Sequence, residues 1–180
     1  MDDEIIGFLD ESSPQNTSNT VRMWSFKRSE KIKNTAKYRI NCIGFYAING
    51  TSTCSFMERS RKEDICAFLV EIRRNNPEKK IKVVLDNFAS HHAAKVMELS
   101  LELRIELIFL PPYSPDLNPI EFIWKSIKRV VSRNFIASEH HMKSLISKSF
   151  QELSPFNSFS IGWIRKFIPE EYNKYRKLGI

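Results

Sequence analysis

The sequence predicts an α/β domain with a mixed sheet, and three observations support this fold class. Two short apolar runs, at residues 5–9 and 81–85, are typical of strands that are buried on both faces. Between them, Asn49-Gly50 separates two strand-like segments and predicts an antiparallel hairpin. In the second half, helical periodicity alternates with strands, as in parallel crossover connections. Antiparallel strands followed by parallel crossovers give a mixed sheet.

The first part of the chain is predicted to contain the antiparallel strands. Residues 5–9 form the first strand, and the polar stretch 12–20 forms a loop. Residues 21–26 alternate imperfectly and are a candidate short strand. Residues 38–48 are rich in aromatic and β-branched side chains, and the hairpin turn leads them into a strand at 51–56.

The second part is predicted to alternate helices with strands. Asn75-Asn76-Pro77 ends the first helix, Ser90 caps the second, and Pro111-Pro112 ends the last strand. The predicted elements are helix 61–75, strand 81–85, helix 90–101, strand 106–110, helix 118–133 and helix 139–153.

The helix at 118–133 carries the clearest start signals. Asn118 can cap it, Pro119 suits the first helical position and Glu121 the third. One apolar stripe runs along it, made of Ile120, Ile123, Trp124, Ile127, Val130 and Val131. Basic side chains, Lys125, Lys128, Arg129 and Arg133, are expected on its exposed side.

Length and charge suit one globular domain with an anionic partner. The chain has 180 residues, and 42% of them are hydrophobic, enough for a full core. Lys and Arg number 28 against 21 Asp and Glu, which gives a net charge of +7. Nucleic acid is the leading anionic partner. A basic protein without such a partner is the alternative.

Cysteine usage and the N-terminus favour an intracellular protein. Cys42, Cys54 and Cys66 form no metal-binding pattern, so we expect reduced thiols and no zinc site. No apolar stretch reaches the length of a membrane span, so no membrane partner is expected. The acidic start, Asp2-Asp3-Glu4, is the reverse of a secretory signal.

Three carboxylates are candidates for one metal site. Asp10 and Asp86 each end an apolar run, and Glu121 lies at a helix start. Ligands bind at the carboxyl ends of strands in open α/β sheets, and hard divalent cations take oxygen ligands. Each carboxylate also has a simpler explanation. An Asp after a strand is an ordinary turn residue, whereas Glu121 can complete a capping box or pair with Lys125.

Neighbouring groups compete with these three. Glu11 should point away from Asp10, because side chains alternate along a strand. Asp116 is explained by a Ser-Pro-Asp turn, and Asp2 is a further competing carboxylate. His91 and His92 follow Asp86 closely and can touch a phosphate or the metal shell, but the start of a helix is the favoured explanation.

Taken together, these residues resemble the catalytic domain of DDE transposases, of the mariner type and its prokaryotic insertion-sequence relatives. The similarity extends over residues 5–134, and the spacing from Asp86 to Glu121 fits it. The motifs are Phe8-Leu9-Asp10-Glu11, then Val83-Val84-Leu85-Asp86-Asn87 with His91-His92, and Leu110-Pro111-Pro112-Tyr113-Ser114-Pro115-Asp116-Leu117-Asn118-Pro119-Ile120-Glu121 with Trp124 and Lys128.

The resemblance implies a ribonuclease-H-like fold, with a mixed five-stranded sheet flanked by helices as in retroviral integrases. The catalytic domain would occupy residues 1–153, and residues 154–180 would be a basic, aromatic tail. Asp10, Asp86 and Glu121 would be the catalytic residues and would hold two Mg²⁺ or Mn²⁺ ions, with Asp86 bridging both. Trp24 and Lys27 resemble the Trp and Lys that follow the first Asp in the family, whereas Arg28 stands where Gly is common.

The implied function is metal-dependent cleavage of DNA at transposon ends and strand transfer into target DNA. Double-stranded DNA, both transposon ends and target, is the implied partner, and a homodimer is a further possibility. The family's helix-turn-helix region is absent ahead of Asp10, and three explanations stay open: a split transposase with a separate helix-turn-helix polypeptide, a trimmed chain, or a remnant. The compartment would be the cytoplasm of a prokaryote, at the nucleoid, or the nucleus of a eukaryote.

Two alternatives to an active transposase remain open. One is an inactive remnant that acts as a non-specific DNA-binding or assembly module, and the other is a structure-specific nuclease of the same fold. The four basic residues of helix 118–133 are candidates for DNA phosphate contacts, with a solvated helix face as the alternative. More basic residues can extend that surface: Arg165, Lys166, Lys174, Arg176 and Lys177.

Overall fold

A computed structural model of the chain describes residues 3–16, 26, 36–59, 61–112 and 114–170. At its centre lies a five-stranded sheet in the order β3-β2-β1-β4-β5. β1 pairs antiparallel with β2 and parallel with β4, so the sheet is mixed, as predicted. The strands are β1 (Glu4–Ser12), β2 (Cys42–Ala47), β3 (Thr53–Phe56), β4 (Lys80–Leu85) and β5 (Ile105–Phe109).

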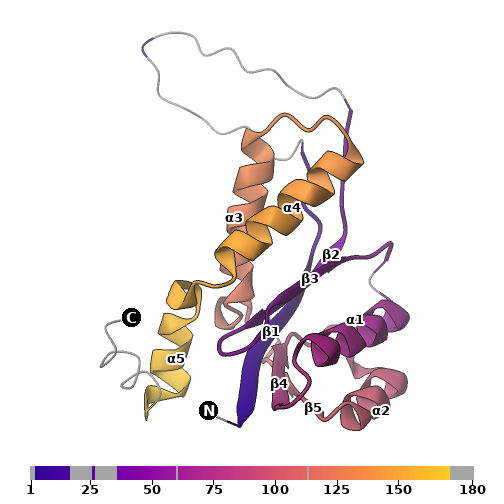
Figure 1. Cartoon of the computed structure of the whole chain (residues 1–180), viewed down its shortest axis with the longest axis vertical. Coiled ribbons are helices and arrows are strands. Elements are labelled where there is room, and N and C mark those ends of the chain that lie inside the picture. Colours follow the sequence, from indigo (N-terminus) through magenta and orange to yellow (C-terminus); the bar gives the residue numbers. More distant parts are fainter. Residues whose placement is uncertain (1–2, 17–25, 27–35, 60, 113, 171–180) are drawn as a thin grey trace.

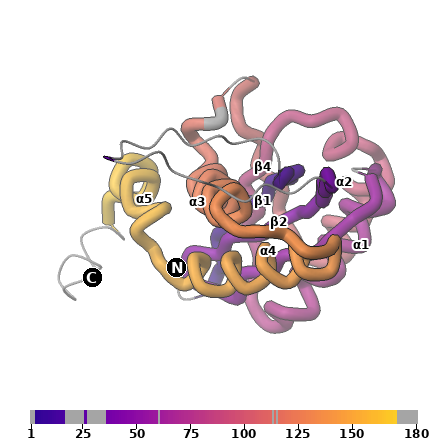
Figure 2. Tube along the Cα trace, turned by 90° about the horizontal axis from the view of Figure 1, so that it is seen from above, coloured from indigo at the N-terminus to yellow at the C-terminus, as the bar shows by residue number. Residues whose placement is uncertain are grey.

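Helices cover both faces of this sheet (Figure 1, Figure 2). α1 and α2 lie on one face, whereas α3, α4 and α5 lie on the other. The helices are α1 (Lys62–Asn75), α2 (Ala94–Glu102), α3 (Ile120–Arg133), α4 (Glu139–Leu153) and α5 (Ile161–Phe167). Short 3₁₀ turns in the described ranges precede three of these helices: η1 (Ala89–His92) before α2, η2 (Pro115–Leu117) before α3, and η3 (Asn157–Phe159) before α5. No helix in these described ranges is both long and apolar enough to span a membrane.

The central strand β1 contributes to two separate cores, because its side chains alternate between the two faces. Phe8 packs into the core beneath α3 with Trp124 and Tyr46. Leu9 packs into the core beneath α1 with Leu69. All five side chains are fully buried or nearly so. This two-sided burial explains the continuous apolar run that predicted the strand.

The segment after α4 packs against the same core. Tyr46 Oη donates a hydrogen bond to the carbonyl oxygen of Phe156 at 2.8 Å. The Ile164 side chain is fully buried, and the Trp163 ring meets the Phe8 ring edge-on, with centroids 4.9 Å apart. The division of the chain at residue 153 stays a prediction.

The hairpin is confirmed, but its loop is longer than a tight Asn-Gly turn. β2 begins at Cys42 rather than at residue 38, and β3 begins at Thr53 rather than at 51. The Asn49 side chain is occupied elsewhere: its Oδ1 accepts from Ile6 N at 3.0 Å, and its Nδ2 donates to Glu4 O at 2.7 Å. Asn49 therefore ties the loop to β1 instead of forming a two-residue turn.

Two predicted helix starts are wrong. Ser90 does not cap a helix: residues 89–92 form η1, and α2 begins at Ala94 with Ala93 at the N-cap. Asn118 does not cap α3, whose N-cap is Pro119. The Asn118 side chain donates instead to Leu9 O at 3.2 Å. Glu121 is therefore the second residue of α3 and forms no capping box.

The remaining differences are small. β1 runs on to Ser12, so Asp10 lies inside the strand rather than after it. β5 lies one residue earlier than predicted, whereas α4 has the predicted bounds. The candidate strand at 21–26 lies outside the described residues except for its last position, a bend. The three cysteines are free thiols, two of them buried and Cys54 partly so, as expected.

Candidate metal and nucleic-acid site

Parallel pairing places Asp10 and Asp86 at one edge of the sheet. β1 and β4 pair in register up to Phe8 and Val84. Asp10 and Asp86 each follow two residues later, so they lie at the same level of the two neighbouring strands. Phe8 and Val84 both pack beneath α3. Because side chains alternate along a strand, Asp10 faces α3 as well.

A glycine lets α3 approach Asp10. Gly44 is the cross-strand partner of Asp10 on β2. A Cβ at this position would lie 2.7 Å from Trp124 Cζ2 and 3.1 Å from Ile120 Cδ1. The bare backbone therefore allows the first turns of α3 to pack directly on the sheet. Glu121, at the start of α3, comes near Asp10 for this reason.

The three predicted carboxylates line one cleft. Its volume is about 490 Å³, and Asp10, Asp86 and Glu121 all contribute to its wall. The other lining residues are Asn87, Phe88, Leu110, Pro111, Pro112, Ser114 and Asn118. Within the described ranges, no three His, Cys, Asp or Glu side chains are already arranged to hold a metal ion. The carboxylates share a cleft, and a common ion would require their side chains to turn toward it.

The charges in this cleft repel one another. Burial raises the pKa of Asp10 to about 8, and the charge of Glu121 adds to the effect. Glu11 and Asp86 act in the same direction. Several carboxylates held this close favour a cation among them. The set of oxygen donors matches the preference of Mg²⁺ or Mn²⁺.

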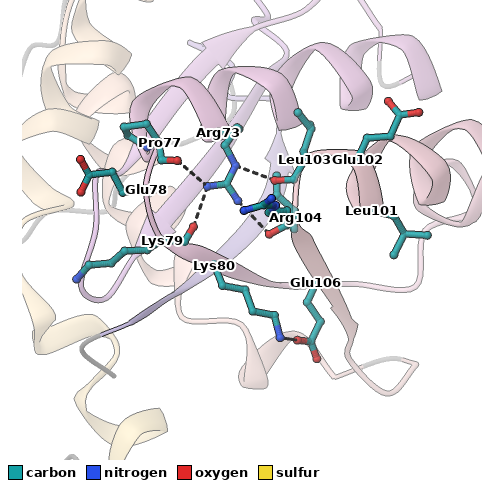
Figure 3. A pocket seen from close by; sticks show the side chains of 11 residues that line it. Arg73, Pro77, Glu78, Lys79, Lys80, Leu101, Glu102, Leu103, Arg104 and Glu106 are labelled. Carbon is teal, nitrogen blue, oxygen red and sulfur yellow. Dashed lines mark hydrogen bonds and ion pairs between the residues drawn. The ribbon is translucent and has the colours of Figure 1, made fainter.

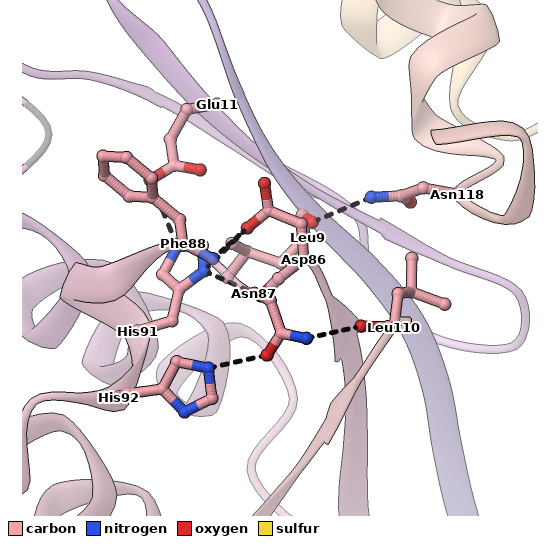
Figure 4. Close-up of polar contacts among 9 residues, drawn as sticks. All are labelled: Leu9, Glu11, Asp86, Asn87, Phe88, His91, His92, Leu110 and Asn118. Atoms are coloured by element: carbon pink, nitrogen blue, oxygen red, sulfur yellow. Dashed lines mark hydrogen bonds and ion pairs between the residues drawn. The ribbon is translucent and has the colours of Figure 1, made fainter. Parts of the chain in front are cut away.

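Asp86 is held by His91, a histidine that does not line the cleft (Figure 4). His91 Nδ1 lies 3.0 Å from Asp86 Oδ1, and His91 Nε2 lies 3.2 Å from Glu11 Oε1. The hydrogen bond from His91 is the main cause that lowers the pKa of Asp86. Burial alone would lower the pKa of His91, but its bonds to Asp86 and Glu11 outweigh burial and raise it to about 10.

The inward position of His91 explains why Ser90 does not cap a helix. The η1 turn directs the His91 ring inward, where it is fully buried. Ser90 Oγ is left buried without a hydrogen-bond partner. Glu11 points away from Asp10, as predicted, and that orientation is what lets it reach His91. From the sequence, the start of a helix is the favoured explanation of His91, and contact with the metal shell is the weaker one. The position of His91 five residues after Asp86 is the only sequence signal for its contact with that carboxylate.

Asn118 presents an unpaired oxygen at the same cleft. Its Nδ2 must face Leu9 O, because two carbonyl oxygens cannot bond. The Oδ1 atom is buried and has no hydrogen-bond partner. A buried acceptor without a donor is costly in a folded protein. A ligand that brings a donor, such as a water on a metal ion, would satisfy it.

The basic residues predicted to meet DNA lie on the exposed side of α3. Lys125, Lys128, Arg129 and Arg133 are all exposed, and their contact with DNA stays a prediction. Arg165 and Lys166 are exposed on α5. Further residues named from the sequence lie outside the described residues: Asp2, Trp24, Lys27, Arg28, Tyr113, Lys174, Arg176 and Lys177.

Two other predicted competitors have local roles. Asp116 is exposed in η2, a turn closed by Leu117 N donating to Ser114 O. The His92 ring stacks on Phe109, with centroids 4.1 Å apart, and its Nε2 lies 2.7 Å from Asn87 Oδ1. Neither side chain lines the cleft.

A larger cleft, about 750 Å³, lies at the opposite end of the parallel strands (Figure 3). Arg73 dominates it. Its guanidinium donates to the carbonyl oxygens of Leu103, Asn76, Pro77, Lys79 and Arg104. These bonds join the end of α1 to two loops and use the donors that a ligand would need. Arg73 therefore has a structural role there, and the smaller acidic cleft is the candidate site.

Comparison with known proteins gives the family of this chain. Residues 6–143 match the family model of the DDE superfamily endonucleases. No match was found among curated proteins. The catalytic domain of Mos1 mariner transposase has a similar structure, with a TM-score of 0.65, 18% identity, and coverage of 94% of this chain and 79% of that domain.

Other Mos1 structures are similar at the same level. The Mos1 transposase paired-end complex with left transposon end gives a TM-score of 0.66 at 20% identity, and covers 94% of this chain and 53% of that one. This chain therefore spans about half the length of that transposase. The Mos1 catalytic domain and Raltegravir with Mg and with Mn gives TM-scores of 0.63 and 0.64, at 16% and 17% identity. Each covers 94% of this chain and 80% of that domain.

These likenesses confirm the predicted ribonuclease-H-like fold, with its five strands between two layers of helices. The family match, over residues 6–143, includes Asp10, Asp86 and Glu121. The chain therefore belongs to the DDE superfamily of endonucleases.

Proposed function

We propose that this chain is the catalytic domain of a DNA transposase. It cleaves phosphodiester bonds at transposon ends and transfers the freed strands into target DNA. The observation that carries this proposal is the convergence of Asp10, Asp86 and Glu121 on one cleft in a member of the DDE superfamily. The Mos1 complex with transposon-end DNA supports the choice of substrate.

Asp10, Asp86 and Glu121 would hold two divalent cations, Mg²⁺ or Mn²⁺. When bound, such a pair activates the attacking oxygen and stabilises the leaving oxygen. The crowding of the three carboxylates and the unpaired Asn118 Oδ1 support cation binding. The Mos1 structures with Mg and with Mn support the choice of metal.

The remaining work of the protein is to position DNA. Asp86 would be the ligand shared by the two ions, and its side chain is 54% exposed and lines the cleft together with Asp10. Lys125, Lys128, Arg129 and Arg133 would contact phosphates, which fixes the duplex without reading its sequence. Water attacks first at a transposon end, and the freed 3′-hydroxyl then attacks target DNA in the same cleft. No covalent bond to the enzyme forms in either step.

The partners and the location follow from the substrate. Recognition of transposon ends would come from a helix-turn-helix polypeptide, and two copies of the catalytic domain would act on two ends as a homodimer. The catalytic unit would occupy residues 1–153, with residues 154–180 as a basic, aromatic tail. The protein would work where DNA is, at the nucleoid of a prokaryote or in the nucleus of a eukaryote.

The test is cleavage of plasmid DNA by the purified chain with Mg²⁺ or Mn²⁺. We expect wild-type protein to nick DNA only with metal, and Asp86→Ala to reduce the rate on the order of 10³-fold, since metal contacts supply several kcal/mol to the transition state. Asp116→Ala is the matched control, because Asp116 is an exposed carboxylate that does not line the cleft. Equal cutting by wild type and Asp86→Ala would refute the proposal.

The same assay separates the two alternatives. An inactive remnant would bind DNA in a salt-sensitive way and give no metal-dependent product. The exposed basic side of α3 is compatible with that outcome. A structure-specific nuclease would cut branched DNA and would give no joined product when offered a pre-cut end with a free 3′-hydroxyl.

A further inference from the structure

We propose that His91 is a positioning residue that fixes the Asp86 carboxylate in the orientation needed for cation binding, and that Glu11 fixes His91 from behind. This inference rests on the proposed function, because it assigns His91 a role at the metal site proposed above. His91 would not touch DNA or the cation. It would act through Asp86.

The two oxygens of Asp86 have different surroundings. Oδ1 is 3.0 Å from His91 Nδ1, which also hydrogen-bonds the backbone carbonyl oxygen of Asp86 at 3.2 Å, and Oδ1 accepts a hydrogen bond from Phe88 N at 3.0 Å. Among the described residues, no donor contacts Oδ2. In Figure 4 the second oxygen points away from the His91 ring. Two donors on one oxygen fix the rotation of the carboxylate and leave the other oxygen for the cleft.

The ring that makes this contact cannot turn. His91 is fully buried, and Glu11 Oε1 lies 3.2 Å from its Nε2 at the opposite side of the ring. The Phe88 ring meets it edge-on, with centroids 6.0 Å apart. A flipped or rotated imidazole would lose both carboxylate contacts at once. The orientation of Asp86 is therefore set by a ring that is itself held at two ends.

Alternation along β1 creates this arrangement. Asp10 faces α3 and the cleft, whereas its neighbour Glu11 faces the α1 and α2 side, where η1 carries His91. β1 thus supplies the candidate metal ligand Asp10 on one face. On the opposite face it supplies Glu11, which holds His91 against the second candidate metal ligand, Asp86. Groups that orient metal ligands typically contribute 10–100-fold to metal affinity. His91 and Glu11 have the geometry of such groups.

The experiment measures Mn²⁺ affinity directly on purified protein without DNA, from the electron paramagnetic resonance signal of free Mn²⁺. We expect His91→Leu to weaken affinity about 10–100-fold. His91→Asn places an amide nitrogen near the Nδ1 position, so it should restore most of the affinity. A residue that only filled space would show the reverse order, because Leu fills the buried pocket better than Asn.

Two further variants complete the comparison. His92→Leu is the control, because His92 is exposed and contacts neither Asp86 nor Glu11. It should bind Mn²⁺ as wild type does. Glu11→Leu removes the rear contact and should weaken affinity by about 10-fold, the lower end of the range. If His91→Leu does not fold, as judged by circular dichroism, His91→Asn and Glu11→Leu still decide the question.

The outcomes distinguish this inference from the proposed function. If wild-type protein binds no Mn²⁺, or if Asp86→Asn binds it equally well, the metal site itself is wrong. If wild type binds Mn²⁺ through Asp86 but folded His91→Leu and Glu11→Leu bind it with unchanged affinity, only the positioning role is refuted. If both variants lose affinity while His92→Leu does not, the positioning role is established.

Discussion

The two ends of the β1–β4 strand pair carry charge in opposite ways. At the beginning of the strands, Lys82 Nζ lies 2.7 Å from Glu4 Oε2, and Lys80 Nζ lies 2.8 Å from Glu106 Oε2. Acidic and basic side chains are therefore paired at this end, which we call the mixed end. At the other end, which we call the acidic end, Asp10 and Asp86 line a cleft together with Glu121. No lysine or arginine lines this cleft.

The difference separates charged side chains that are paired within the fold from carboxylates whose cleft contains no lysine or arginine. The strand residues Glu4, Lys80 and Lys82 at one end and Asp10 and Asp86 at the other follow the same alternation, on the face that packs beneath α3. Exposed ion pairs contribute little to stability, and their loss is tolerated. A cluster of one sign opposes folding, so its presence calls for a partner. The acidic end therefore has the properties of a binding site, and the mixed end does not.

The largest expected effect comes from removing a carboxylate at the acidic end. Asp10→Asn should reduce metal-dependent DNA cleavage on the order of 10³-fold, because a lost ligand removes about 4 kcal/mol of transition-state stabilisation. Lys80→Met, at the mixed end, should leave the rate within about 2-fold. Single-turnover nicking assays measure both. Comparable losses in the two variants would show that the two ends do not differ in function.

Metal binding should stabilise the fold through the acidic end alone. A ligand at 100 times its Kd adds about 2.7 kcal/mol to the free energy of unfolding. For a chain of this size, that raises Tm by roughly 5–10 °C. Differential scanning calorimetry with and without Mn²⁺ should show the shift in wild type and Lys80→Met, and its loss in Asp10→Asn. A shift that survives in Asp10→Asn would place the ion elsewhere.

The glycine beneath α3 gives the next effect, on stability. Gly44→Ala should lower the free energy of unfolding by about 1–3 kcal/mol, because the new Cβ overpacks against buried Trp124. It should also weaken Mn²⁺ binding, since α3 carries Glu121. Gly162→Ala is the matched control: no atom lies within 4 Å of its added Cβ, and alanine is favoured in a helix by up to about 1 kcal/mol. Urea unfolding compares the two, and equal losses would contradict the packing argument.

Local sequence patterns were sufficient for most of the fold, whereas they only made the three carboxylates candidates, which the family resemblance then selected. The strand at 81–85 and the helix at 139–153 have periodicities that no distant contact overrides. What local patterns could not give were pairs far apart in the chain. His91 meets Glu11, 80 positions away, and Asn118 meets Leu9, 109 positions away. The contact of Asn118 with β1 takes the place of the predicted cap of α3. The inward turn of His91 toward β1 takes the place of the predicted helix start at Ser90.

The smallest expected effect concerns pH and the mixed end. The hydrogen bond from Lys82 lowers the pKa of Glu4 below its ordinary value of 4.5. A carboxyl whose pKa is lower in the folded state contributes stability above its unfolded pKa and loses it as pH falls through the folded one. Lys80 has a raised pKa, chiefly through Glu106, so its contribution is lost only in strong alkali.

Glu4→Gln isolates this contribution. The difference in urea midpoint between wild type and Glu4→Gln should be small and constant from neutral pH down to about 4.5, and should then vanish as pH falls further. The acidic end behaves in the opposite sense, since burial and like charges raise the pKa of Asp10. A carboxyl whose pKa is raised in the folded state disfavours folding increasingly as pH rises from its unfolded pKa to its folded one, so in the absence of metal Asp10→Asn should gain stability over wild type between about pH 4 and about pH 8 and keep a constant advantage above that. If the two variants instead followed one common pH profile, the contrast between the two ends would not hold.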